Sequence, residues 1–269
     1  MLYRRSVLLF LVIWAATFDS FSQESGPPRT RTVQRDPQAL TILTQVLNAA
    51  GGGTALAAIH DMTATGTITY YWAGEEVQGT VTVKGRGTGQ FRLDASLPDG
   101  VRSWGVNNGT GFVKEQDGSK NQIPYHNTVN FGSLTFPFAY ILAAPRDNST
   151  SITYVGLETK DGRQIHHIRM RKIFPSDDDP GDILSKLSTR DFFIDPVTFQ
   201  VVSTLDMVHP LNASTIDYPH EMLFSDYRPA NGFLVPFSIT EVATGQRTYT
   251  IQLNQVTFNG ALKDSDFDQ

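Results

Sequence analysis

The sequence predicts an α+β fold in which one large, strongly curved antiparallel β-sheet of about 11–13 strands packs on two or three helices. Two patterns support this class. Apolar residues first recur with a helical period, and from Met62 onward they tend to occupy every second position, the period of a strand with one buried face. Helices do not alternate with strands along the chain, so the pattern of a parallel α/β protein is missing.

The first predicted helix begins after a polar segment. Asp36 is a suitable N-cap, and Pro37 suits the first helical position. The glycine run 51–53 is expected to end this helix, and Thr54 to cap a second, shorter helix over 55–61. The first helix carries one apolar stripe, formed by Ala39, Ile42, Leu43, Val46, Leu47 and Ala50.

An antiparallel meander follows. Residues 63–70, 77–84 and 91–94 alternate between apolar and polar side chains, and AGEE and GRGTG form the turns between them. Asp226 and Arg228, two positions apart on a later strand, are expected to form a surface ion pair. Further strands are expected at about 102–107, 111–116, 120–124, 151–157, 163–173, 190–195, 199–207, 219–227, 233–242 and 247–257.

The middle of the chain interrupts the strands. Residues 134–145, LTFPFAYILAAP, are apolar on every side, and Thr135 and Pro137 suit a first helical turn. We therefore expect a short buried helix here. Residues 176–182, SDDDPGD, are interpreted as a solvated acidic loop, because their spacing does not fit a calcium-binding loop.

The N-terminus has the order of a secretory signal peptide. Residues 1–22 contain two arginines, an apolar run and small residues at the expected cleavage site. The apolar run is shorter than the ~20 residues of a membrane-spanning helix, which favours a cleaved signal peptide over a membrane anchor. Residues 23–35 then form a flexible leader and residues 36–269 a single domain. An exported chain without cysteine fits the periplasm of a Gram-negative-type bacterium.

Composition and motifs argue against several function classes. The lack of cysteine removes thiol nucleophiles and cysteine-based metal sites, and a net charge of −5 offers no field for nucleic acid. His166 and His167 are neighbours on an expected strand, so they point to opposite faces and cannot bind one metal together. His220-Glu221 lacks the second histidine of a metalloprotease motif. We expect no catalytic residue, no metal and no cofactor.

Two regions of the chain resemble a known family. FSDYRPANGFLVPFSI (224–239), followed by TYTIQLNQVTFNGALKDSDFD (248–268), resembles the ending of the LolA-like outer-membrane lipoprotein-sorting proteins. GGGTALAAIHDMTATGTITY (51–70) resembles their beginning. The resemblance implies the fold shared by LolA, LolB and RseB, an incomplete β-barrel wrapped over helices around an apolar cavity that holds acyl chains. Such a half-barrel also buries the apolar face of a wide sheet without closing it.

The same resemblance implies a non-catalytic periplasmic carrier or sensor. It would bind lipid or lipoprotein acyl chains as a monomer and contact a membrane-associated protein partner. Two alternatives stay open: an exported hydrolase or sugar-active enzyme with carboxylates or histidines on the concave face, and a protein-interaction module. The apolar residues that are candidates to line the cavity, or else to pack a dry core, are Ile68, Tyr70, Trp72, Phe91, Leu93, Phe136, Phe138, Ile141, Met222, Phe224, Phe237 and Ile239.

Overall fold

Thirteen strands form one antiparallel sheet in the computed structural model, which describes residues 32–131, 137–179, 181–210, 213 and 215–268. Their spatial order is β6-β5-β4-β3-β2-β1-β13-β12-β11-β10-β9-β8-β7. The strands are β1 Met62–Trp72, β2 Glu75–Arg86, β3 Gln90–Leu97, β4 Gly100–Asn107, β5 Thr110–Lys114, β6 Lys120–Ile123, β7 Thr150–Lys160, β8 Arg163–Lys172, β9 Arg190–Ile194, β10 Val201–Val208, β11 Tyr218–Ala230, β12 Phe233–Ala243 and β13 Gln246–Phe258.

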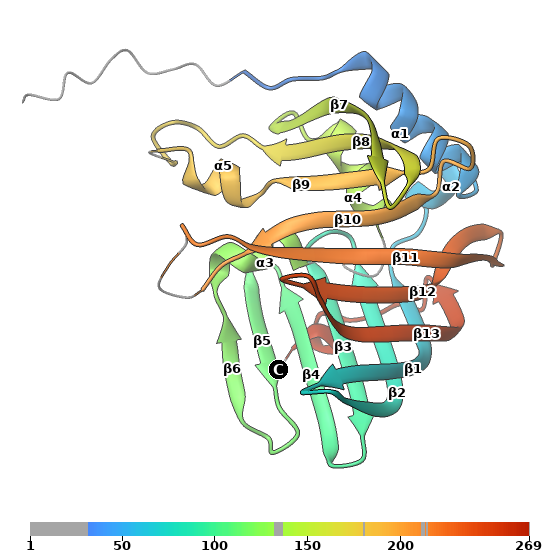
Figure 1. Ribbon diagram of the computed structural model, residues 1–269, viewed down its shortest axis with the longest axis vertical. Helices are drawn as coiled ribbons and strands as arrows, with labels where there is room; N and C mark the ends of the chain where they lie inside the picture. The colour runs from blue at the N-terminus through green and yellow to red at the C-terminus, as the bar shows by residue number, and fades with distance from the viewer. Residues whose placement is uncertain (1–31, 132–136, 180, 211–212, 214, 269) are drawn as a thin grey trace, which may run out of the picture. The chain divides into compact units, whose positions relative to one another are not determined.

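The sheet consists of two meanders joined at one seam. Strands β1–β6 and strands β7–β13 each pair with their sequence neighbours, and β1 pairs with β13 from Met62↔Phe258 to Tyr70↔Tyr249. Consecutive strands β6 and β7 therefore lie at opposite edges of the sheet. Strand direction turns strongly between β13 and β4 (Figure 1), which gives the predicted curved, open antiparallel sheet.

The helix α1 (Pro37–Ala49) forms where its capping residues predict it. The Asp36 carboxylate accepts hydrogen bonds from Gln38 N at 2.8 Å and from Ala39 N at 3.3 Å. The next helix, α2 (Gly53–Ala57), does not use Thr54 as its cap. Gly52 occupies the N-cap with φ 101°, a backbone conformation that favours glycine, so Thr54 lies inside the helix and that prediction is wrong.

The apolar face of the sheet packs against three helices. Ile68 of β1 lies opposite Ile251 of β13, and both are fully buried. α1, α2 and α4 (Phe138–Ala143) cover this inner face and contribute Leu43, Leu56 and Ile141 to the same hydrophobic core. Because the chain must pass from β6 at one edge to β7 at the other, α4 lies on the connection that crosses the inner face.

Two further helices were not expected from the sequence. They are α3 (Tyr125–Phe131) and α5 (Ile183–Leu187), so the described residues contain five α-helices rather than two or three. The helix expected over 134–145 is present as α4 and a 3₁₀ turn at Ala144–Arg146, while its first residues, 134–136, lie outside the described residues.

The acidic stretch does not stay fully solvated. Asp179 is buried, and its carboxylate accepts hydrogen bonds from Leu184 N at 2.7 Å, Ser185 N at 2.9 Å and Ser185 Oγ at 2.7 Å. The two N–H donors are amide groups of the first turn of α5, which have no partner within the helix. A carboxylate of the expected loop therefore starts a helix, which corrects that prediction.

The expected leader ends in ordered contacts. The expected signal peptide, residues 1–22, and residues 23–31 of the expected leader lie outside the described residues. Gln34 N donates to Ser151 Oγ at 3.0 Å, and Arg35 forms a β-bridge with Ile152, so the end of the leader binds the start of β7. Within the described part of the chain, no helix has the length and apolar character needed to cross a membrane.

Candidate functional site

The residues expected to line a cavity mostly form a packed core. Ten of the twelve are buried: Ile68, Tyr70, Phe91, Leu93, Phe138, Ile141, Met222, Phe224, Phe237 and Ile239. Trp72, at the end of β1, is 49% exposed, and Phe136 lies outside the described residues. The helices thus fill much of the inner face, and of the eleven described candidates only Phe91 lines the pocket described next.

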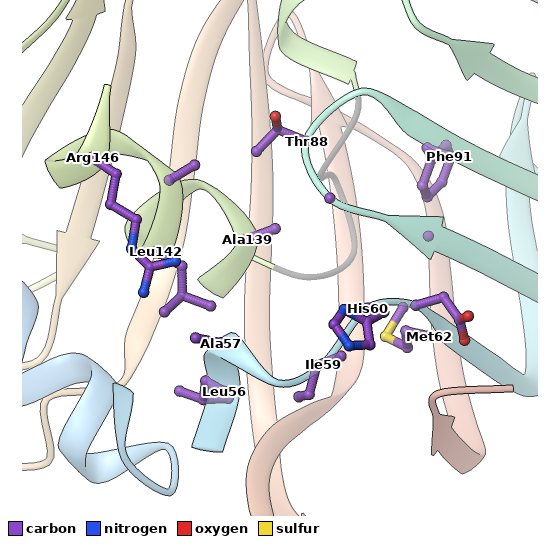
Figure 2. A pocket seen from close by; sticks show the side chains of 14 residues that line it. Leu56, Ala57, Ile59, His60, Met62, Thr88, Phe91, Ala139, Leu142 and Arg146 are labelled. Atoms are coloured by element: carbon purple, nitrogen blue, oxygen red, sulfur yellow. The ribbon is translucent and has the colours of Figure 1, made fainter. Parts of the chain in front are cut away.

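An apolar pocket of about 260 Å³ lies between α2, α4 and the β2–β3 turn. Figure 2 shows Leu142 and Arg146 pointing toward α2 from the α4 side, with His60 on the segment that leads into β1 and Met62 at the start of that strand. An apolar cavity of roughly 150 Å³ accepts a benzene-sized ligand, so this space can hold a longer hydrocarbon segment. Its apolar walls are Leu56, Ala57, Ile59, Met62, Phe91, Ala139, Leu142 and Ala143.

Small residues create the space in this pocket. Gly85 follows Val81 and Val83 on the inner face of β2 and pairs with Met62, so a missing side chain leaves this part of the sheet uncovered. A Cβ atom at Gly85 would lie 3.9 Å from Met62 Cε, an ordinary contact. Gly87 is different, since its φ of 57° belongs to the turn itself. On the opposite wall, the short side chain of Ala139 also leaves space in the pocket.

The floor of the pocket is fixed by Asp61. Its buried carboxylate accepts hydrogen bonds from Gly260 N at 2.7 Å and Leu262 N at 3.0 Å, which ties the α2–β1 segment to the C-terminal tail. His60 is exposed at the rim, and its backbone amide donates to Asn259 Oδ1 at 2.7 Å. We assign Asp61 a structural role, because its oxygens are occupied by backbone amides.

A second pocket of about 180 Å³ adjoins the first along α4 and shares Thr88 and Ala143 with it. We call it the basic pocket, because the described residues that line it include three cations, Arg171, Lys172 and Arg190, against one carboxylate, Asp147. Arg171 pairs with Asp182, and Arg190 pairs with Asp206 at 2.6 Å. The Lys172 ammonium lies 5.6 Å from the centre of the Phe174 ring.

A buried charged network crosses four strands behind the basic pocket. Asp206 accepts from Arg190 Nη2 at 2.6 Å and lies 2.8 Å from His220 Nδ1, while His220 Nε2 lies 3.1 Å from Glu241 Oε1. Burial alone would lower the pKa of His220, but Asp206 and Glu241 outweigh it and raise the pKa to about 10. Burial would raise the pKa of Asp206, yet Arg190 and His220 hold it below its ordinary value. Sequence reasoning did not identify this network.

The other polar predictions are resolved by individual contacts. His166 Nδ1 lies 3.0 Å from the Tyr154 hydroxyl, whereas His167 contacts Glu158 and Asp191, so the two imidazoles have separate partners. In the described residues no group of three histidine, aspartate or glutamate side chains is arranged to hold a metal ion.

The predicted surface ion pair is confirmed. Arg228 Nη2 lies 2.6 Å from Asp226 Oδ2, and both side chains are largely exposed. Its contribution to stability is therefore small.

Comparison with solved structures identifies the fold. The chain is similar to an outer membrane lipoprotein-sorting protein domain from Vibrio parahaemolyticus, with 10% identity, a TM-score of 0.52, and coverage of 86% of this chain and 96% of that one. It is equally similar to a LolA superfamily protein from Nitrosomonas europaea, with 9% identity, a TM-score of 0.53, and coverage of 86% and 97%. A DUF1329 family protein from Desulfovibrio piger matches with 9% identity, a TM-score of 0.52, and coverage of 87% and 98%.

These likenesses define a LolA-like fold, which confirms the resemblance found in the sequence at the level of the fold. No protein-family model matches the sequence, and no curated protein matches it significantly.

Proposed function

We propose that this protein is an exported, non-catalytic carrier that binds an acyl chain of a lipid or lipoprotein in the apolar pocket between α2, α4 and the β2–β3 turn. The observation that carries the proposal is the pocket itself, about 260 Å³ with mainly apolar walls. It lies on the inner face of a fold shared with a lipoprotein-sorting domain, which supports the assignment.

Affinity in such a site would come from removing hydrocarbon from water. Each buried methylene contributes ~0.8 kcal/mol, so about ten buried methylenes supply the roughly 8 kcal/mol of micromolar binding, and more are needed to offset the cost of association. Entry of a longer chain requires α4 to move, because its apolar residues Phe138 and Ile141 already fill the adjoining core.

The remaining parts of the proposal concern location and partners. Residues 1–22 would direct export to the periplasm and be removed, leaving the leader 23–35 and the domain 36–269. The protein would act as a monomer that meets its cargo at a membrane or on a membrane-associated protein.

The enzyme alternative predicted perturbed titrating groups gathered in one pocket. Such groups are present in the Asp206–His220–Glu241 network. They bind one another, however, and neither Asp206 nor His220 lines the apolar or the basic pocket. Carriage is therefore better supported than catalysis.

The proposal is tested by purifying the protein gently from its own periplasm and recording native mass spectra. We expect a co-purifying lipid adduct, and displacement of a bound fluorescent fatty acid by unlabelled fatty acid. Absence of any adduct together with no fatty-acid binding would contradict carriage of acyl chains.

A further inference from the structure

Two cations line the pockets without an ion pair among the described residues, Arg146 after α4 and Lys172 at the end of β8. Arg146 is exposed at the rim of the apolar pocket, and Lys172 lines the basic pocket. In the described part of the chain neither forms an ion pair, whereas Arg171 and Arg190 of the basic pocket each pair with an aspartate. Arg146 and Lys172 are thus the cations that a bound anion could approach without displacing a protein carboxylate.

Asp147 is the one carboxylate among the described residues that line the basic pocket, and hydrogen bonds within its own turn occupy it. Asp147 accepts from Ser149 N at 2.9 Å, Ser149 Oγ at 2.6 Å and Thr150 Oγ1 at 2.9 Å. Burial alone would raise the pKa of Asp147, but these hydrogen bonds and nearby Lys172 hold the pKa below its usual value. Both carboxylate oxygens of Asp147 therefore already accept hydrogen bonds, and among the described residues Asp147 forms no ion pair with Lys172.

The carbonyl groups at the end of α4 are also covered. Arg35 donates from Nη1 to Ala144 O at 2.9 Å and from Nη2 to Asp147 O. Free carbonyls at a helix C-terminus repel anions, and this arginine offsets that effect. The chain as a whole carries a net charge of −5, so the unpaired cations Arg146 and Lys172 differ in sign from the protein's overall charge.

The two pockets are close enough for one molecule. Thr88 and Ala143 belong to the walls of both, so the boundary between apolar and basic space is formed by two small side chains. A ligand that spans this boundary must have hydrocarbon at one end and a charged or polar group at the other.

We infer that the ligand is a single-chain amphiphile with an anionic head group. Its acyl chain occupies the apolar pocket, and its carboxylate or phosphate lies beside Arg146 and Lys172. This inference rests on the proposed function, since it names the class of molecule that the same pocket carries.

The test compares probes with one chain and different head groups. Binding of dodecanoate, dodecyl phosphate, dodecanol and dodecyltrimethylammonium is measured by calorimetry on the mature protein at low salt. We expect at least one anionic probe to bind about tenfold more tightly than dodecanol, with the difference shrinking as salt is added. The relative affinities of dodecanoate and dodecyl phosphate then distinguish a fatty acid from a phosphate head group.

The double variant Arg146→Gln/Lys172→Gln should keep dodecanol affinity and lose the preference for anions. Lys120→Gln, an exposed lysine on β6, is the matched control and should keep that preference. Equal affinities for all four probes, or an anion preference that survives in the double variant, would overturn the inference while leaving acyl binding intact. Failure of every probe to bind the unaltered protein would instead contradict the proposed function.

Discussion

Filling the space above Gly85 tests the pocket most directly. In Gly85→Val the new side chain would project from β2 toward Met62, whose Cε lies 3.9 Å from the position that the added Cβ would take. The backbone of Gly85 does not have the positive φ that restricts Gly87, so valine fits without strain. The substitution changes the pocket volume and leaves its charged rim in place.

The expected magnitude follows from the hydrocarbon that valine excludes. Its isopropyl group takes the room of about three methylenes, and each contributes ~0.8 kcal/mol on burial, which gives about 2.4 kcal/mol. Acyl affinity should therefore fall about fiftyfold. The free energy of unfolding should rise by about 1 kcal/mol, because valine adds buried apolar area and suits a strand better than glycine.

Two measurements check this expectation: fluorescent fatty-acid displacement for affinity, and urea denaturation for stability. Thr80→Val, at an exposed position of the same strand, is the control and should bind as the unaltered protein does. If Gly85→Val proved unstable, Ala139→Leu would fill the pocket from the opposite wall. Unchanged fatty-acid affinity in a folded filled variant would refute the assignment of the site.

Three other predictions concern stability, each measured by urea denaturation. Asp206→Asn leaves Arg190 and His220 buried without their shared anion and should cost about 3–5 kcal/mol; a loss below about 1 kcal/mol would contradict the network. Because its pKa is raised from 6.5 to about 10, protonated His220 should stabilise the fold fully below pH 6.5, and this contribution to the free energy of unfolding should be lost as the pH rises through about 10. His220→Gln should not show this loss. Asp36→Ala should cost about 1 kcal/mol by removing the α1 cap, and an unchanged midpoint would argue against it.

Local signals explain which parts of the fold the sequence could predict. Asp36 and Pro37 act on the helix that follows them, so the start of α1 could be recognised in the sequence. Alternation assigns residues such as Ile68 to one face of a strand, so the buried face could be recognised as well. The short helices α3 and α5 span seven and five residues, too few to show a helical period. α5 depends on the buried carboxylate of Asp179, which sequence alone presents as one more charge in an acidic run.

The site was less predictable for a physical reason. Alternation shows that Phe91 and Leu93 share a face, but it does not show whether a helix covers them. The pocket exists where no side chain fills the face at Gly85, and a glycine in a strand next to a turn has several possible roles. Likewise, Arg190, Asp206 and His220 come together only through strand pairing across β9, β10 and β11.

The β1–β13 seam also determines when folding can finish. Each meander pairs neighbours in sequence and can begin to form as it emerges, but the first strand must wait for the last strand of the chain before the sheet becomes continuous. Until then β1 presents an unpaired edge of eleven residues. Completion of this fold is therefore a late, slow event, and a protein lacking β13 would expose a template for aggregation.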